Sequence, residues 1–262
     1  MKIKSIILAA GRGSRLKRIT KNLPKALIKI NKKTLFQYQT EALIKNNIFD
    51  RNIVTGFKAN KFSEYQYNKI LNTKWKTTNM VYSLFCAEKI LKESQNVLIH
   101  YGDIIFESKI VRKLINTKGD IVVVVDKSWK EIWKLRFNNP LDDAESLRMN
   151  KKGLITDIGK KEKNIKNIQG QYAGLILLRK KGIEEFLKFK KKYSNKKIPN
   201  LNKNFNNLYM TDLLQYLIDK KIKINAAIVN KGWLEVDSVN DLNLYKKLVK
   251  NNKLSNFFKS SV

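Results

Sequence analysis

The stretch Ile6-Ile7-Leu8-Ala9-Ala10-Gly11-Arg12-Gly13-Ser14-Arg15-Leu16, followed by Pro24-Lys25, decides the fold. An apolar run that leads directly into a glycine-rich loop is typical of a buried parallel strand and a phosphate-binding loop. Glycines let the backbone turn its N–H groups toward an anion, and fixed cations neutralise phosphate charge. The loop is neither a Walker loop nor a dinucleotide fingerprint, because Leu16 stands where the latter has its third glycine.

Outward from this stretch, short apolar runs alternate with amphipathic segments. This alternation is typical of a parallel sheet covered by helices on both faces. The two runs at 147–149 and 154–158 flank a turn and predict an antiparallel hairpin beside the main sheet. Helices are expected at 34–46, 61–71, 80–91, 182–191, 210–220 and 238–249, and further strands at 3–9, 27–30, 52–55, 97–101, 120–125, 175–178 and 224–229.

At 262 residues the chain can bury one large core, and its apolar content of 43% is typical of a globular protein. The one cysteine, Cys86, excludes an internal disulfide and suits a reducing compartment. The apolar start is too short for a signal peptide, and no run approaches the ~20 apolar residues of a membrane helix. We therefore expect a soluble, cytoplasmic protein that does not act at a membrane.

The net charge is extreme, because 54 Lys and Arg residues against 22 Asp and Glu residues give +32. Such a charge is common in proteins that bind nucleic acid. The lysines, however, are spread along the whole chain together with abundant Asn and Ile, the pattern expected of an AT-rich genome. We therefore expect no nucleic-acid partner, but we expect the field to attract anionic substrates.

Asp103, with Gly102, follows the apolar run at 97–101. An aspartate at the carboxyl end of a central parallel strand lies in the crevice where α/β proteins bind ligands. Its carboxylate either holds Mg²⁺ against a triphosphate or caps the next helix, for which Ser108 is the better candidate. His100, the one histidine, is expected to be a buried strand residue rather than a catalytic base.

Asn79 precedes the helix expected at 80–91, and Ser83 lies one turn further on the same face. The Asn79 side chain either caps this helix or contacts a ligand at its positive end. Trp129, Trp133 and Arg136 follow one another at i, i+4 and i+7 and share one face of a helical turn. The two tryptophans either pack in the core or form an aromatic cage for an ammonium group.

These motifs resemble the nucleotidyltransferases that activate sugar phosphates and small phosphorylated alcohols or amino acids. The signature L-A-A-G-x-G-x-R-L followed by P-K carries the resemblance, and matching segments extend over nearly the whole chain. The segments T-T-N-M-V-x-S-L-F-C-A and W-x-x-x-W-x-x-R-F-x-x-P-L-x-D-A-E are most similar to small cytidylyltransferases of the phosphocholine and phosphoglutamine type. The lone cysteine and histidine, and the lack of a G-x-S-x-G elbow, argue against hydrolases and covalent acyl transfer.

The resemblance implies a Rossmann-like three-layer α/β/α fold with a mostly parallel central sheet and a small antiparallel acceptor-binding subsheet. It implies one catalytic domain over 1–250, with the nucleotide-binding half at about 1–125 and the acceptor-binding half at about 126–250. The remaining residues, 251–262, are expected to be a loose tail or an oligomer contact, so a homodimer is left open.

The resemblance also implies roles for individual residues. Arg15 and Lys25 would be catalytic and bind phosphates, and Asp103 and Asp237 would bind Mg²⁺. By sequence alone, Asp237 could equally belong to the cap of the helix that begins at 238. The residues assigned to nucleotide binding are Leu8, Ala9, Ala10, Gly11, Arg12, Gly13, Ser14, Asn79, Ser83 and Gly102.

The acceptor would be held by residues of the second half, which are Trp129, Trp133, Arg136, Glu145, Tyr172 and Glu235. For a phosphoglutamine-like acceptor, Glu145 or Glu235 would meet the amino group and Arg136 the carboxylate. For phosphocholine, Trp129, Trp133 and Tyr172 would form the cage.

The sequence hypothesis is an Mg²⁺-dependent cytidylyltransferase that moves CMP from CTP to a small phosphorylated amino compound and releases pyrophosphate. Such activated groups would serve cell-surface polysaccharide or lipid modification. Two alternatives stay open, namely a sugar-1-phosphate enzyme that uses UTP or dTTP and a non-catalytic nucleotide- or RNA-binding relative. The second has little need for Arg15, Lys25, Asp103 and Asp237 together.

Overall fold

The computed structural model describes residues 2–199 and 201–259. Its strands are β1 (Lys4–Ala9), β2 (Lys29–Ile30), β3 (Lys33–Thr34), β4 (Asp50–Thr55), β5 (Asn68–Leu71), β6 (Asn96–Tyr101), β7 (Ile104–Phe106), β8 (Ile121–Asp126), β9 (Glu145–Met149), β10 (Ile155–Lys161), β11 (Gln171–Arg179), β12 (Asn225–Val229) and β13 (Trp233–Glu235). Its α-helices are α1 (Leu35–Ile44), α2 (Met80–Cys86), α3 (Glu88–Lys92), α4 (Ser108–Asn116), α5 (Trp129–Arg136), α6 (Lys180–Tyr193), α7 (Met210–Asp219) and α8 (Val239–Lys250).

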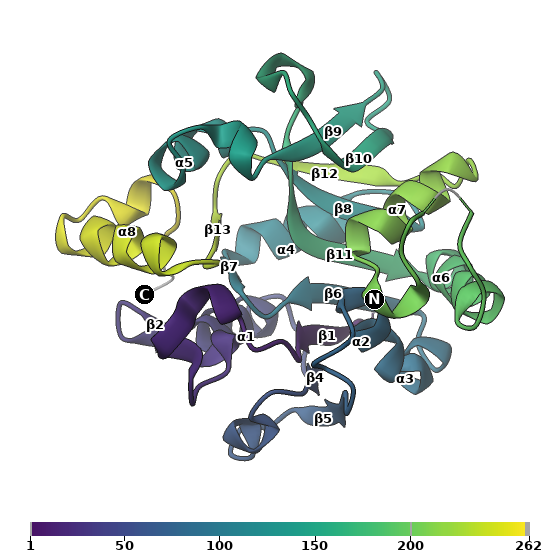
Figure 1. Cartoon of the computed structure of the whole chain (residues 1–262), viewed down its shortest axis with the longest axis horizontal. Coiled ribbons are helices and arrows are strands. Elements are labelled where there is room, and N and C mark those ends of the chain that lie inside the picture. Colours follow the sequence, from purple (N-terminus) through teal and green to yellow (C-terminus); the bar gives the residue numbers. More distant parts are fainter. Residues whose placement is uncertain (1, 200, 260–262) are drawn as a thin grey trace.

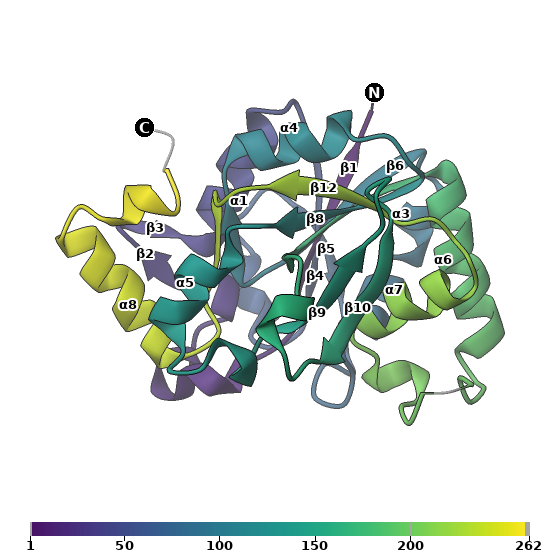
Figure 2. The ribbon, with the colours of Figure 1, turned by 90° about the horizontal axis from the view of Figure 1, so that it is seen from above.

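A seven-stranded sheet with the order β12-β8-β11-β6-β1-β4-β5 forms the centre of the molecule (Figure 1). All neighbouring strands are parallel except β11, which runs antiparallel to both β6 and β8. The antiparallel pair β9–β10 lies beside this sheet, as the hairpin prediction requires (Figure 2). The mostly parallel α/β architecture with a small antiparallel subsheet is therefore confirmed.

Helices cover both faces of the sheet, because the central strands are apolar on both sides. In β8, Val122 and Val124 pack in one core cluster with residues of α1, α4, α5 and α8. Val123 and Val125 point the other way and pack with residues of α2, α6 and α7. This period of two along an all-apolar strand is what a buried parallel-type strand produces.

Two helix predictions need correction. The segment 61–71 is not a helix but a short 3₁₀ turn, Ala59–Phe62, followed by the edge strand β5. Pairing with β4 decides this conformation, and since most of β5 is exposed, it lacks the apolar alternation that identifies a strand. The helix expected at 80–91 is interrupted at Ala87, which separates α2 from α3.

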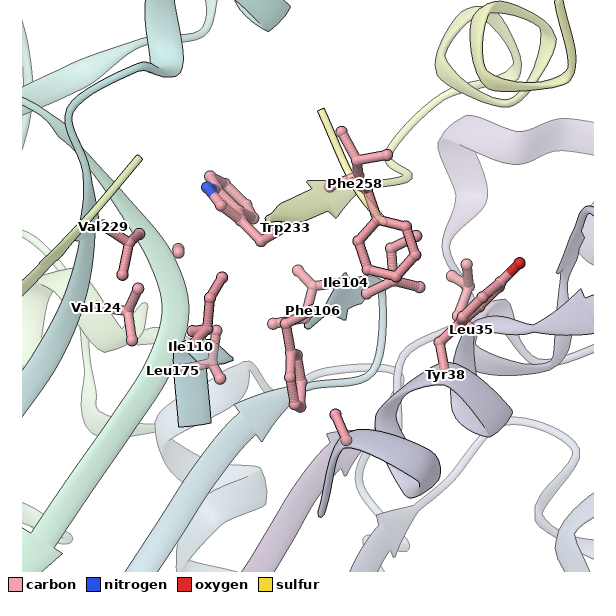
Figure 3. Close-up of a cluster of buried hydrophobic side chains, with 14 of the residues drawn as sticks. Leu35, Tyr38, Ile104, Phe106, Ile110, Val124, Leu175, Val229, Trp233 and Phe258 are labelled. Atoms are coloured by element: carbon pink, nitrogen blue, oxygen red, sulfur yellow. The ribbon is translucent and has the colours of Figure 1, made fainter. Parts of the chain in front are cut away.

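The C-terminal segment packs against the core, so the expectation of a loose tail is wrong for residues 251–259. Phe258 is buried and its ring meets that of Tyr38 at 5.4 Å (Figure 3). The Gly232 amide donates to the carbonyl of Phe257, and the Lys259 amide donates to Glu107 Oε1. Residues 260–262 lie outside the described residues. Across 2–199 and 201–259, the structure has no helix with the length and apolar character needed to cross a membrane.

Candidate active site

A cavity of about 270 Å³ opens at the carboxyl ends of β1 and β6. Its wall contains the glycine loop, the start of α2 and the turn between β6 and β7, which are brought together because parallel strands end at one edge of the sheet. Nine of the ten residues predicted to bind nucleotide line it, and these are Leu8, Ala9, Ala10, Gly11, Gly13, Ser14, Asn79, Ser83 and Gly102. The predicted catalytic residues Arg15 and Lys25 and the predicted metal ligands Asp103 and Asp237 line it as well.

The glycine loop is shaped by one left-handed residue. Gly13 has φ 69° and ψ 52°, and a Cβ there would lie 3.0 Å from Cδ of Lys25. Glycine therefore lets the Lys25 side chain cross directly behind the loop. Arg12 does not line the cavity, and its assignment to nucleotide binding stays a prediction. Its guanidinium lies over the ring of Phe57 at 5.7 Å from the centroid.

Asn79 serves as a helix cap and also lines the cavity, so the two alternatives for this residue are compatible. Its side chain accepts a hydrogen bond from the Met80 amide at 2.9 Å. Ser83 is buried one turn on, and Asn72 Nδ2 donates to its Oγ at 3.0 Å. The side chain of Asn72 therefore fixes the Ser83 hydroxyl at the cavity wall.

Lys25 is the centre of the charged part of the site. Its Nζ lies 2.7 Å from Asp103 Oδ2 and 2.6 Å from Asp237 Oδ1, and Arg15 reaches Asp237 Oδ2 at 2.9 Å. Burial opposes the charged ammonium, but the two aspartates outweigh it and raise the pKa of Lys25 above its usual value. Burial also opposes the charged form of Asp237, but the neighbouring Lys25 and Arg15 outweigh this effect and lower the pKa of the Asp237 carboxyl below its usual value.

Pairing between β7 and β13 brings these carboxylates together. Asp103 follows β6, and Asp237 follows β13, which pairs antiparallel with β7. The Val236 amide donates to the carbonyl of Asp103 at 2.9 Å, which joins the two segments directly beside both aspartates. Neither aspartate caps the following helix, because Ser238 and Asp241 form the capping box of α8 and the side chain of Asp103 bonds Lys25.

The donors at this place suit a divalent cation that prefers oxygen ligands. One oxygen each from Asp103, Glu235 and Asp237 lies within 4.8 Å of the others. Oδ1 of Asp103 is buried without a hydrogen-bond partner among the described residues, and the Lys25 ammonium sits where a cation is needed. Three carboxylates around one cationic position fit Mg²⁺.

A second cavity of about 300 Å³ adjoins the first, since Arg15, Met80, Tyr101 and Asp237 line both. Four of the predicted acceptor residues, Trp133, Glu145, Tyr172 and Glu235, line this second cavity. Trp129 and Arg136 do not, so their assignment to the acceptor is corrected. Trp129 is 1% exposed and packs edge-on against Trp133 with ring centroids 5.8 Å apart.

Arg136 is a buried structural cation with 1% of its side chain exposed. Its Nε donates to Asp241 Oδ1 at 2.8 Å, its terminal nitrogens lie 3.3 Å from Glu235 Oε2, and its guanidinium lies 4.8 Å from the centroid of Trp133. Arg136 therefore orients Glu235 and Trp133, which line the second cavity, although it does not line that cavity itself.

The second cavity is acidic in a strongly cationic protein. Among the described residues lining it, Asp143, Glu145, Glu235 and Asp237 face a single cation, Arg15. Burial, together with Asp143, raises the pKa of Glu145 to about 6. Burial and the neighbouring Asp237 likewise raise the pKa of Glu235 above its usual range. Such a cavity attracts a cationic group.

Several lining residues were missed by the sequence reasoning. Those of the first cavity are Ala26, Trp75, Thr78, Met80 and Tyr101, and those of the second are Met80, Tyr101, Asp143, Gln171, Tyr209, Thr211 and Trp233. Trp233 had a signal, because it precedes Glu235 by two in an apolar strand and faces the same side. Asp126 Oδ2 accepts from its indole at 3.0 Å and orients the ring. The other residues lie mostly in loops and helix starts without a distinctive pattern.

Known proteins are similar to this chain over most of its length. The sequence profile of the MobA-like NTP transferase domain matches residues 5–198. The chain is 39% identical over 248 residues to a CTP:phosphoglutamine cytidylyltransferase of Campylobacter jejuni, which covers 91% of this chain and 97% of that protein. A choline-phosphate cytidylyltransferase of Streptococcus pneumoniae is 38% identical over 96 residues, which are 35% of this chain and 42% of that protein.

Solved structures show the same fold at lower identity. The inositol-1-phosphate CTP transferase of T. maritima superposes with a TM-score of 0.73 at 21% identity, over 95% of this chain and 96% of that one. The CTP:phosphocholine cytidylyltransferase of Streptococcus pneumoniae gives 0.69 at 21% identity, over 95% and 100%. With the profile match, this chain belongs to the MobA-like NTP transferase family and is a nucleotidyltransferase.

Proposed function

We propose that the protein transfers CMP from CTP to the phosphate of a small phosphorylated amino compound and releases pyrophosphate. The observation that carries the proposal is the pair of adjoining cavities that share Arg15 and Asp237, one beside the glycine loop and one lined by acids and aromatic rings. Two substrates bound in these cavities would meet at the charged cluster of Lys25, Asp103 and Asp237.

The reaction is an in-line displacement in which an acceptor phosphate oxygen attacks the α-phosphorus and pyrophosphate leaves. The acceptor phosphate is already anionic, so the chain needs to supply positioning and charge neutralisation rather than a general base. Arg15 and the Gly11–Gly13 amides would bind the leaving pyrophosphate. Lys25 would contact the α-phosphate and the incoming phosphate, and in doing so would release Asp103 and Asp237.

Asp103 and Asp237, with Glu235 beside them, would hold Mg²⁺. When bound, the ion supplies Lewis-acid charge neutralisation at the phosphates. The glycine backbone and Asn79 would orient the nucleotide.

The wall of the second cavity favours an acceptor that carries a cationic amino group. Asp143, Glu145 and Glu235 suit an ammonium. The rings of Trp133, Tyr172 and Trp233 line the same cavity and would suit either a primary or a quaternary ammonium. We favour a phosphoglutamine-like acceptor, because the relative that matches nearly the whole chain is named for phosphoglutamine.

The test is pyrophosphate release with Mg²⁺, crossing CTP, UTP, dTTP, ATP and GTP with five acceptors. These are phosphoglutamine, phosphocholine, phosphoethanolamine, 2-aminoethylphosphonate and glucose 1-phosphate. We expect turnover with CTP and an amino-bearing acceptor, highest with phosphoglutamine. Turnover only with UTP or dTTP and glucose 1-phosphate would establish the sugar-phosphate alternative. Silence of the folded protein across the panel would contradict the proposal.

A further inference from the structure

Gln39 is a fully buried polar side chain that lies next to the active site but does not line either cavity. It stands on α1 with 0% of its surface exposed, among residues that are otherwise apolar on this face of the helix. A polar side chain in such a position lowers the stability of the fold unless it is hydrogen-bonded. Its partners therefore indicate what it does.

The amide of Gln39 bridges the two ends of the turn that carries Asp103. Nε2 donates to the carbonyl of Tyr101 at 3.0 Å and to the carbonyl of Ile104 at 2.5 Å. Tyr101 is the last residue of β6 and Ile104 the first of β7, so the two bonds bracket Gly102 and Asp103. Because both partners are carbonyl oxygens, only the NH₂ group can face them, which settles the orientation of the amide.

The other end of the same amide is unsatisfied. Oε1 of Gln39 is buried and has no hydrogen-bond partner among the described residues. An orphaned buried acceptor is unfavourable, and an apolar side chain of the same length would avoid it. The two hydrogen bonds that Nε2 donates therefore explain why a glutamine stands at this position. Departures of this kind from local stability are expected near functional sites.

The remaining backbone bonds of the turn connect it to both halves of the site. The Gly102 amide donates to the carbonyl of Leu8 beside the glycine loop, and the carbonyl of Asp103 accepts from the Val236 amide, each at 2.9 Å. A Cβ on Gly102 would lie 2.9 Å from Cβ of Ala9, so the turn lies directly against β1. Gln39 supplies the contact from the side of the turn that faces α1, since Leu35 and Tyr38 of this helix belong to the same core cluster as Ile104.

We propose that Gln39 is a positioning residue that holds the Asp103 turn so that the carboxylates of Asp103 and Asp237 present a preformed site for the divalent cation. This inference rests on the proposed function, because it gives Asp103 and Asp237 the metal. Gln39 touches neither the metal nor the substrates. Its effect reaches the carboxylates through the backbone of Tyr101 to Ile104 and through the bond between Val236 and Asp103.

The experiment measures how strongly Mg²⁺ enhances nucleotide binding. The affinity of the full-length protein for α,β-methylene-CTP, which cannot transfer CMP, is determined by calorimetry in Mg²⁺ and in EDTA. The ratio of the two affinities is the Mg²⁺ enhancement. The variants are Gln39→Met and Gln39→Asn. Methionine keeps the length of the side chain but has no hydrogen-bond donor, and asparagine keeps the amide on a side chain that is one methylene shorter.

Leu43→Ala is the matched control, because Leu43 is fully buried on the same helix and makes no bond to the turn. It is expected to lower the thermal midpoint at least as much as the Gln39 variants while leaving the Mg²⁺ enhancement unchanged. The Gln39 variants are expected to lose about tenfold or more of the enhancement, as residues that orient metal ligands generally do. Their affinity for the analogue in EDTA should remain within about twofold of the wild type, because the glycine loop is untouched.

An enhancement in Gln39→Met and Gln39→Asn equal to that of the wild type would overturn the inference and leave the proposed function standing. A loss of equal size in Leu43→Ala would also overturn it, since the effect would then follow stability alone. No Mg²⁺ enhancement in the wild-type protein would overturn the metal assignment itself, and with it the role of Gln39.

Discussion

Lys25 places one ammonium group between two carboxylates that come from distant parts of the chain. Its partners Asp103 and Asp237 lie 78 and 212 residues away in the sequence. Without bound substrates the ammonium neutralises these carboxylates. A triphosphate in the adjoining cavity offers Lys25 stronger anionic partners, and the same carboxylate oxygens then become available to a divalent cation. The proposed function therefore implies that Lys25 exchanges partners when the substrates bind.

Replacing Asp103 by asparagine should abolish CMP transfer and leave the fold intact. The change removes one negative charge from the proposed cation site but keeps the shape of the side chain. We expect the rate of pyrophosphate release to fall by about 10³-fold or more, since electrostatic stabilisation of the transition state is the main term in such reactions. Asp219→Asn, on the exposed face of α7, is the control and should keep wild-type turnover. Near-normal activity of folded Asp103→Asn protein would contradict the metal assignment.

Replacing Lys25 by methionine should make the protein less stable without metal and more responsive to it. Asp103, Glu235 and Asp237 would then repel one another, with Arg15 beside Asp237 and Arg136 beside Glu235 as the remaining cations, and the free energy of unfolding should fall by about 3–5 kcal/mol. Mg²⁺ should raise the thermal midpoint more in Lys25→Met than in the wild type, because the ion no longer competes with the ammonium.

This is measured by thermal unfolding in EDTA and in Mg²⁺. Lys33→Met removes a half-exposed pair with Glu41 and should change neither the midpoint nor its response to Mg²⁺. Equal Mg²⁺ shifts in the wild type and Lys25→Met would show that Lys25 and the ion do not compete.

Among the secondary-structure elements, those with local signals were predicted well. Thr34 and Ser238 are the N-cap residues of α1 and α8, and each capping box lies within four consecutive residues of the sequence. The strand β5 was missed because its conformation comes from pairing with β4 and not from its own pattern. The role of Arg136 could not be found either, because its partner Asp241 lies 105 residues away and on another helix. The periodicity of one helix does not indicate which charged residue of another helix will form an ion pair with Arg136.

The pair of Arg136 and Asp241 joins α5 to α8 beneath the second cavity, and breaking it should be costly. In Arg136→Met the carboxylate of Asp241 stays buried without its cation, so the free energy of unfolding should fall by about 3–5 kcal/mol. The surface pair of Arg148 and Glu162 offers the comparison, and Arg148→Met should cost much less stability, because water screens this pair. Urea unfolding of both variants measures the difference.

Arg136→Met should also raise KM for the acceptor more than KM for CTP. Glu235 and Trp133 line the second cavity, which we propose for the acceptor, and they would lose the guanidinium that orients them. The contacts of Arg136 do not include the glycine loop. Equal stability of Arg136→Met and the wild type would show that the pair is not structural.

For the whole molecule, the motif around Gly11 indicated the fold and the lining of the first cavity, because the strand, the loop and the predicted phosphate-binding residues are consecutive. The lining of the second cavity was predicted less completely, because Asp143, Tyr209 and Thr211 come from separate loops and helix starts. The distribution of charge over the molecule could not be predicted from the sequence either, because it depends on how the chain folds. A chain with a net charge of +32 forms an acid-lined cavity, which no composition reveals. The cationic exterior would attract CTP, and the acidic interior would select the cationic part of the acceptor.

The pH dependence of global stability should carry the signature of one buried residue, His100. Its ring is fully buried against Phe106, both its nitrogens are without partners among the described residues, and burial lowers its pKa from 6.5 to about 3. Between these two pH values the unfolded chain binds a proton that the folded protein does not. The contribution of His100 is therefore complete above about pH 7 and is lost as the pH falls, by at most about 1.4 kcal/mol per pH unit.

His100→Leu removes this titration while keeping an apolar side chain in the strand. Other groups titrate in the same range, including Glu145 with its raised pKa, so the informative quantity is the difference in unfolding free energy between the two proteins at each pH. Urea unfolding from pH 8 to pH 5 should show the wild type losing stability relative to His100→Leu as the pH decreases. A difference that stays constant over this range would mean that His100 is protonated equally in both states, and that the strand beneath the active site is open to water.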